Sequence, residues 1–138
     1  MILHIPVYKL GSRLNHFKPM IEASLAKGTL GRMSYLDIET GLLTGAYDFW
    51  IKRRKDQEEA DYFFITYDAI YENHNGIELF LLGGDIRSPE SFRKDVANWE
   101  NRLRKEGYNS ISLTGRRGWK KILPDDYKEV RIVMTKEL

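Results

Sequence analysis

A short segment near the end of the chain combines positive charge with an aromatic ring, which makes it the first candidate for chemistry. Its side chains are Arg116, Arg117, Trp119, Lys120 and Lys121. Clustered positive charge beside a rigid ring can contact a phosphate, an acidic groove or a partner protein. A solvated charged surface with Trp119 in the core explains the pattern equally well, because tryptophan is common in ordinary cores. Both interpretations stay open.

Two glycines, Gly115 and Gly118, bracket the basic pair in this segment. Glycine permits a tight backbone path, which a purely solvated helix would not need. The same glycines could simply let a strand turn into a short helix. In that helix, Trp119 and either Ile122 or Leu123 would face inward.

Outside this segment, the sequence offers few residues that could hold a metal or act as a nucleophile. The chain has no cysteine, and its three histidines, His4, His16 and His74, show neither ligand spacing nor a paired carboxylate. We therefore predict no metal site and no catalytic triad.

The composition indicates one globular domain over residues 1–138, with 42% hydrophobic residues to fill a core. A formal net charge of +2 is too small to indicate nucleic-acid binding by bulk electrostatics. Four basic side chains of the 116–121 segment could still neutralise a few phosphates, so nucleic acid remains a weaker alternative. No apolar run approaches a membrane span and no signal peptide is visible, so we expect a soluble protein.

The first third of the chain predicts a strand followed by two helices. Alternating apolar residues predict an edge strand over residues 3–7, where Pro6 is tolerated. A helix follows, with Pro19 placing its first regular turn near Lys18 and Gly28 ending it. Its apolar positions are Leu14, Phe17, Ile21 and Leu25. Ser34 then caps a second, shorter helix.

The middle of the chain predicts three antiparallel strands. Residues 46–51 and 60–71 are rich in aromatic residues and are separated by the charged run 52–59, which suits a solvated hairpin turn. Residues 77–82 are almost continuously apolar, so we expect a central strand covered on both faces. Most aromatic rings of these strands should lie in the core, and any left uncovered would mark a protein interface.

The clearest helix begins at Ser88 and Pro89 and ends at Gly107, with a hydroxyl cap, a proline at the first helical position and a glycine stop. Its apolar stripe is Phe92, Val96, Trp99 and Leu103. A strand, a short helix and a last alternating strand over residues 129–135 complete an α+β pattern.

This order of elements is similar to that of GNAT-type N-acetyltransferases, which implies a mixed, mainly antiparallel sheet with helices on both faces. Four short runs carry a narrower resemblance, most specifically the last of them. They are Leu43-Thr44-Gly45, Phe49-Trp50-Ile51, Leu82-Gly83-Gly84 and Gly115-Arg116-Arg117-Gly118-Trp119. Over most of the chain after Ser34 the sequence resembles small GNAT-like phage and prophage proteins, whose architecture is similar to that of acetyltransferase-like internal virion proteins of short-tailed phages.

The resemblance also implies where a cofactor would bind. Active GNAT enzymes hold the acetyl-CoA diphosphate on backbone N–H groups of the turn before their long helix. The matching candidates here are Gly83, Gly84, Arg87 and Ser88. The two glycines sit side by side, Asp85 adds negative charge and Pro89 removes a donor, so we expect this site to be degenerate. The catalytic candidates, should the chain be an enzyme, are Glu78 as base and Tyr127 as acid.

We therefore expect a non-enzymatic phage virion or assembly protein without a cofactor, binding other virion proteins in the host cytoplasm or in the particle. The partner would contact the basic segment or the aromatic strands. The alternative is an active acetyl-CoA-dependent N-acetyltransferase acting on a host or phage amine.

Overall fold

The computed structural model describes residues 1–28, 32–54, 59–115, 117–131 and 134–138. Five strands and the helices between them follow in an order close to the one expected. They are β1 (Ile2–Ile5), α1 (Val7–Leu10), α2 (Leu14–Gly28), α3 (Tyr35–Leu43), β2 (Asp48–Arg53), β3 (Ala60–Tyr71), β4 (His74–Gly84), α4 (Pro89–Lys105), β5 (Ser110–Leu113) and the 3-10 helix η1 (Arg117–Lys121).

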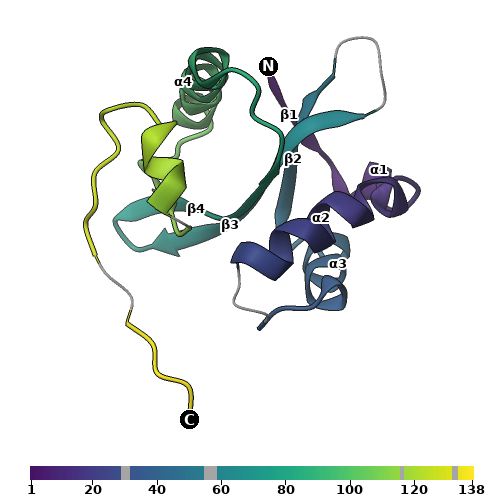
Figure 1. The fold of residues 1–138 in the computed structure, drawn as a ribbon. Coiled ribbons are helices and arrows are strands. Elements are labelled where there is room, and N and C mark those ends of the chain that lie inside the picture. Colours follow the sequence, from purple (N-terminus) through teal and green to yellow (C-terminus); the bar gives the residue numbers. More distant parts are fainter. Residues whose placement is uncertain (29–31, 55–58, 116, 132–133) are drawn as a thin grey trace.

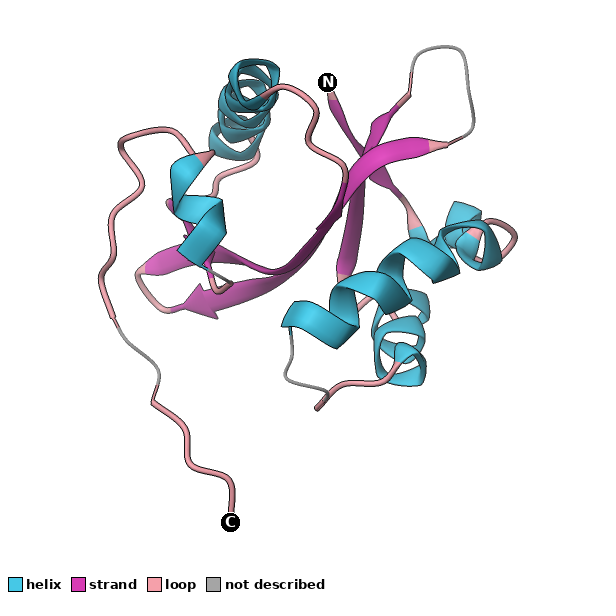
Figure 2. Cartoon of the chain, in the orientation of Figure 1, coloured by secondary structure: helices cyan, strands magenta, loops and turns pink. Residues whose placement is uncertain are grey.

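The five strands form one sheet in chain order, from β1 at one edge to β5 at the other. The first three pairings are antiparallel, and β4 pairs with β5 in parallel. Helices α1, α2 and α3 lie on one side of the sheet, with α4 and η1 on the other (Figures 1 and 2). The predicted α+β class, with a mainly antiparallel sheet and helices on both faces, is confirmed.

The alternation of β3 explains why both faces are buried. Phe63 and Ile65 belong to the core under α2 and α3, whereas Tyr62 and Phe64 belong to the core under α4. The predicted apolar stripes of both long helices are buried against these faces. Most of the aromatic residues are therefore core residues, as expected, and β4 is covered on both sides.

Local signals at the helix ends are confirmed. Ser34 and Asp37 form a reciprocal capping box at the start of α3. The hydroxyl of Ser88 accepts a hydrogen bond from the Ser91 amide at the start of α4, and Gly107 follows that helix with φ +95°.

Two predictions for the N-terminal segment are wrong. The first strand ends at Ile5. Pro6 is the N-cap of α1 and its carbonyl accepts hydrogen bonds from the amides of Lys9 and Leu10, so Val7 is helical. Helix α2 begins at Leu14, and Pro19 lies inside it. The carbonyl groups of Leu10 and Arg13 accept hydrogen bonds that close turns leading directly into α2. The helix is therefore already regular on the N-terminal side of Pro19, which lacks a backbone N–H donor.

The predicted last strand is also wrong for residues 129–131 and 134–135, which the structure describes without strand pairing; residues 132 and 133 lie outside the described part. Val130 and Met134 are 85% and 90% exposed, so their alternation buries no apolar face. Two charged side chains instead contact the body: Glu129 pairs with Lys120 and Arg131 with Glu78. Over the described residues, no helix is long and apolar enough to cross a membrane.

A polar cluster inside the core fixes α4 to the sheet. The carboxylate of Asp95, 7% exposed, accepts hydrogen bonds from Tyr62 Oη at 2.9 Å and from Lys52 Nζ at 3.1 Å, and it also contacts the Met1 amino group at 3.1 Å. Burial alone would raise the pKa of Asp95, but the hydrogen bonds from Lys52, Met1 and Tyr62 outweigh it, so the pKa is lowered. The charged carboxylate therefore stabilises the position of the helix.

Replacing Asp95 tests this anchor. Asp95→Asn removes the charge from a buried pair and should lower the free energy of unfolding by about 2–3 kcal/mol, whereas the exposed Asp68→Asn should change it by less than about 1 kcal/mol. Because the folded-state pKa lies below the ordinary value of 3.8, the stabilisation is complete above that value and is lost as the pH falls through the folded-state pKa. Denaturant titrations at several pH values measure both effects. Equal pH dependence in Asp95→Asn and the parent chain would contradict the assignment.

Candidate functional site

The parallel strands β4 and β5 separate at the point where β4 has one residue more than its other partner, β3. Pairing of β4 with β5 runs from Gly76 opposite Ser110 to Leu79 opposite Leu113, and the Thr114 amide closes it with a 3.1 Å hydrogen bond to the Leu79 carbonyl. On the other side of β4, Ile65 faces Leu81 and Thr66 faces Leu79, so Phe80 is unpaired. Such a bulge bends its strand. The residues after Phe80 therefore continue beside β3 while the chain after β5 turns away. We call this opening the fork.

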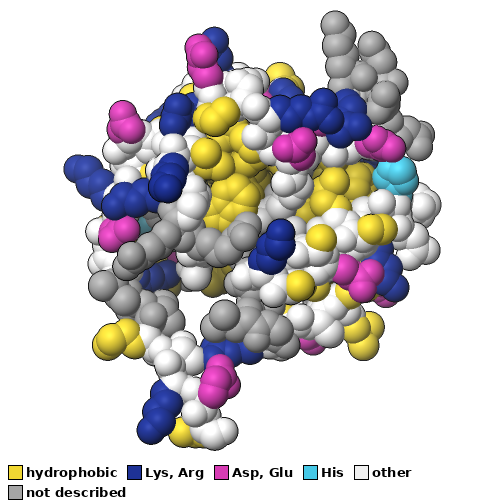
Figure 3. Space-filling view, viewed as in Figure 1, with side chains coloured by type: hydrophobic (Ala, Val, Ile, Leu, Met, Phe, Trp, Pro, Cys, Tyr) yellow, Lys and Arg dark blue, Asp and Glu magenta, His cyan; other side chains and the backbone are white. Residues whose placement is uncertain are grey.

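The fork is lined almost entirely by apolar side chains. The fork holds a small pocket of about 10 Å³, room for about one water molecule. Its lining residues are Leu79, Phe80, Leu81, Leu82, Leu113, Thr114, Gly115 and Trp119. The Trp119 ring lies so close to Gly115 that a Cβ atom at position 115 would be 2.9 Å from ring atom Cδ1. In Figure 3, apolar atoms gather in a hollow on the front of the molecule.

The loop from β4 to α4 borders the fork, and its glycines are required by packing. A Cβ atom on Gly83 would collide with the Ser24 side chain of α2. Gly84 has φ +106°, and a Cβ atom there would lie 2.6 Å from the Tyr62 Cα atom and collide with the Asp61 carbonyl oxygen. Tertiary contacts alone thus explain both glycines.

Several hydrogen-bonding groups of the same loop also bind within the chain. The Asp85 amide donates to the Asp61 carbonyl at 2.7 Å, and the Ser88 hydroxyl caps α4. The exposed side chains of Asp85 and Arg87 pair at 3.3 Å. In the hydrogen bonds of the described residues, the amides of Ile86, Arg87 and Ser88 have no acceptor. This loop therefore offers a few backbone donors beside a carboxylate.

Glu78 lies one residue before the fork, on the side of the sheet that faces α2 and α3. Its neighbours Ile77 and Leu79 point into the core under α4, so its carboxylate points the other way. There it lies 3.6 Å from the Arg131 guanidinium. Burial, followed by the charge of Glu78, raises the pKa of Tyr67 on the paired strand.

Tyr127 lies on the opposite side of the sheet. It packs with Leu123 against the core under α4, where burial and the nearby Glu100 carboxylate raise its pKa. It borders a second small apolar pocket, of about 10 Å³, between α4 and the sheet. The structure therefore does not bring the predicted base Glu78 and the predicted acid Tyr127 together.

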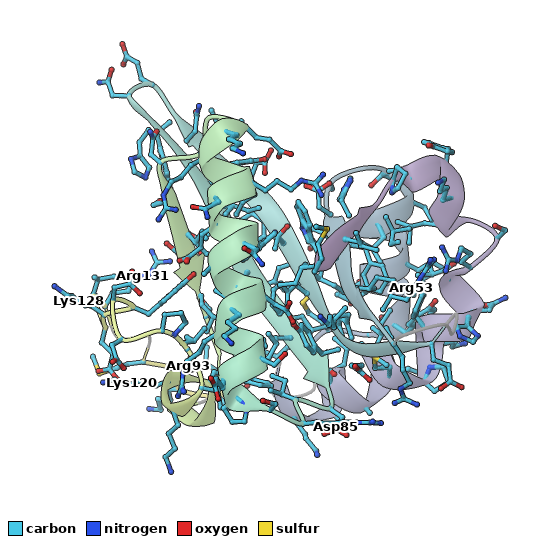
Figure 4. All side chains as sticks on the ribbon, turned by 90° about the horizontal axis from the view of Figure 1, so that it is seen from above. Arg53, Asp85, Arg93, Lys120, Lys128 and Arg131 are labelled. Carbon is cyan, nitrogen blue, oxygen red and sulfur yellow. The ribbon has the colours of Figure 1, made fainter. Side chains whose placement is uncertain are left out.

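The predicted partner-binding segment is divided between the interior and the surface. Arg116 and the side chain of Arg117 lie outside the described part. Trp119 lines the fork, whereas Lys120 is exposed and pairs with Glu129 at 3.1 Å. The Lys121 carbonyl accepts a 2.8 Å hydrogen bond from Arg93 of α4. Sequence reasoning missed Arg93, since it lies on the polar side of a regular helix. Figure 4 shows Arg93 and Lys120 close together near the start of α4.

No metal site emerges from the described residues, where no three histidine, aspartate or glutamate side chains are grouped to hold an ion. The bulge at Phe80 is the functional feature that sequence reasoning could not find, because an aromatic residue in an apolar run carries no signal for an unpaired position.

The packing role of the glycines can be tested by substitution. Gly84→Ala should lower the free energy of unfolding by about 3 kcal/mol, because it adds a collision with β3 to an unfavourable φ. Gly107→Ala is the matched control: its φ is also positive, but a Cβ atom there meets nothing within 4 Å. The control should cost only about 1 kcal/mol. Denaturant unfolding measures both values, and equal losses would show that packing does not require Gly84.

Comparisons with known proteins agree with this architecture. No protein-family model and no curated protein sequence matches the chain. Among solved structures, a probable acetyltransferase superposes with a TM-score of 0.69 at 10% identity, covering 99% of both chains. A ribosomal-protein-alanine N-acetyltransferase from Brucella melitensis gives 0.64 at 12% identity, covering 98% of this chain and 99% of that one. A GNAT family acetyltransferase from Staphylococcus aureus gives 0.66 at 11% identity, covering 100% and 98%.

Identities this low establish architecture and leave activity open. The similarity spans nearly the whole of each protein. The chain has a GNAT-like acetyltransferase fold.

Proposed function

We propose that this protein is a non-enzymatic binding protein on a GNAT fold, which holds another protein instead of transferring an acetyl group. The observation that carries the proposal is the loop between β4 and α4. Its glycines serve packing, its serine hydroxyl caps α4, and one of its amides binds the Asp61 carbonyl. The loop's Arg87 pairs with the Asp85 carboxylate at 3.3 Å, which reduces the positive charge it offers to a diphosphate.

The catalytic candidates support the same proposal. Glu78 faces the Arg131 guanidinium on one side of the sheet, and Tyr127 is enclosed near Glu100 on the other. A general base and a general acid must both reach the reacting atoms of one substrate. These two residues are separated by the sheet itself, so they do not form a working pair.

For the partner, the proposal relies on the sequence resemblance to small phage proteins. The partner would be another virion protein, bound in the host cytoplasm during assembly or retained in the particle. Exposed basic groups near the start of α4, among them Lys120, suit an acidic protein surface. Nucleic acid is a weaker candidate, because the formal net charge of the chain is only +2.

A second candidate function is acetyl-CoA-dependent N-acetyl transfer, favoured by the fork and by the unengaged amides of Ile86, Arg87 and Ser88 at the start of a long helix. In that case the amine would attack the thioester carbonyl near the point where β4 and β5 part. The carbonyl–sulfur bond would break, and coenzyme A would leave as its thiolate and take a proton from solvent. Glu78, one residue before that point, would accept the proton. Arg87 would sit near the diphosphate.

Calorimetric titration with acetyl-CoA separates the two functions. We expect no saturable heat at millimolar acetyl-CoA, because we assign the loop a role in packing and not in binding a diphosphate. Saturable binding that Arg87→Glu abolishes would contradict the proposal and support the enzyme. Lys94→Glu is the matched control, since it reverses a charge on α4, beyond the loop that holds Arg87, at an exposed side chain that lies 3.8 Å from Glu90.

The virion partner is tested separately. In a phage that encodes this chain, mass spectrometry of purified particles should detect it, or deletion of its gene should reduce the yield of complete particles. Particles that lack the protein, together with normal assembly after deletion, would remove the virion role. That result would leave the calorimetric outcome untouched.

A further inference from the structure

A carboxylate and three aromatic rings lie together on the side of the sheet that faces α2 and α3. Tyr67 of β3 is directly opposite Glu78 of β4, so both side chains project to the same face. The ring centroids of Tyr47 and Tyr67 lie 4.8 Å and 5.6 Å from that of Phe80, and 6.4 Å from each other. A Cβ atom at Gly41 of α3 would collide with the Tyr47 ring, so that ring lies directly on the helix. We call Tyr47, Tyr67, Glu78 and Phe80 the Glu78 cluster.

The Glu78 carboxylate has few partners for a group so enclosed. Its side chain is only 14% exposed, and among the described residues its one polar contact is an ion pair with Arg131. Enclosing a carboxylate is unfavourable unless a cation or hydrogen-bond donors compensate. The cluster therefore favours a cation beside Glu78.

Arg131 of the C-terminal segment supplies a cation to the cluster, but loosely. Its Nη2 atom lies 3.6 Å from Glu78 Oε1, which is longer than an ordinary hydrogen bond, and its side chain is 65% exposed. The positive charge of Arg131 also opposes the rise in the pKa of Tyr67 that burial and Glu78 cause, so the guanidinium lies near that side chain as well. The chain's own arginine thus indicates which chemical group the cluster accepts.

The segment that carries Arg131 is weakly held. Residues 128–131 and 134–138 form no helix or strand (Figure 2). Their apolar side chains Val130 and Met134 are exposed. Two further ion pairs join Glu129 to Lys120 and Glu137 to Arg32. Ion pairs between exposed side chains stabilise little and are screened by salt. The segment can therefore give way to a competing cation.

We propose that the Glu78 cluster is a binding site for the guanidinium group of an arginine on the partner protein, and that Arg131 occupies this site until the partner displaces it. A guanidinium suits the site because it can donate two parallel hydrogen bonds to a carboxylate and stack on an aromatic ring. Arg131 makes one long contact with the carboxylate, so a less constrained arginine can bind better. The inference rests on the proposed function, since it requires a protein partner, and it adds the group by which that partner is recognised.

A small arginine analogue tests the site without the partner. An NMR titration with Nα-acetyl-arginine N-methylamide, followed on the ring signals of Tyr47 and Tyr67, measures binding. Arg131→Gln removes the internal competitor and should lower the apparent dissociation constant by about fivefold, as expected if Arg131 fills the site for about four-fifths of the time. Lys128→Gln is the matched control, because Lys128 is a neighbouring cation of the same segment (Figure 4), and it should bind like the parent chain.

Two further comparisons decide the chemistry of the site. Glu78→Gln in the Arg131→Gln background should abolish saturable binding, while a dispersed spectrum shows that the chain is folded. The lysine analogue Nα-acetyl-lysine N-methylamide should bind more weakly, because an ammonium group cannot make the parallel pair of hydrogen bonds. The proposal is overturned if Arg131→Gln shows no saturable binding, if it binds no better than the parent chain, or if the lysine analogue binds equally well. None of these results bears on the acetyl-CoA titration, so a failure here is distinct from a failure of the proposed function.

The contact between the segment and the cluster can also be tested with no ligand. Glu78→Gln should increase the backbone mobility of residues 128–131 in amide relaxation measurements, because it removes the charge that holds Arg131. Asp68→Asn is the control, since it neutralises an exposed carboxylate of β3 that lies outside the cluster, and it should leave that mobility unchanged. Equal mobility in Glu78→Gln and the parent chain would overturn the assignment of Arg131 as the occupant.

Discussion

The unpaired residue Phe80 in β4 is the constraint on which the rest of the site depends. Without it, β4 would continue beside both β3 and β5, and the sheet would leave no opening. With it, β4 bends after Leu79 while the chain after β5 turns into η1. The small pocket, the position of Trp119 and the course of the loop into α4 all follow from this bend. The fork is thus a product of strand register and not of any chemical group.

The loop beside the fork is held from two directions. Asp95 ties α4 to β2 and β3 through Lys52 and Tyr62, and Gly84 lies against the backbone of β3. A loop fixed in this way has little freedom to rearrange around a ligand. Its remaining donors, the amides of residues 86–88, share their surroundings with the Asp85 carboxylate. The scaffold of an acetyltransferase is therefore present, while the polar groups of this loop mainly serve the fold.

Much of the fold could be predicted from the sequence, because local chemistry decides it. Ser34, Ser88 and Gly107 mark helix ends through hydrogen bonds and backbone conformations that operate over a few residues. The alternation along β3 shows which rings share a face. The predictions that failed depended on tertiary contacts. Pro19 lies inside α2 and not at its start. The alternating residues 129–135 have no neighbouring strand in the described part of the chain. Glu78 and Tyr127 were separate candidates for moving the proton, because both lie at plausible places along the chain. Only the strand register reveals that they face opposite sides.

The most direct test of the central claim is an experimental structure determined with the protein saturated in coenzyme A. The account predicts that the amides of Ile86, Arg87 and Ser88 carry no diphosphate, that the Asp85 carboxylate stays beside Arg87, and that Trp119 still lines an unoccupied fork. A pantetheine arm running between β4 and η1, with its diphosphate on those amides, would contradict the account.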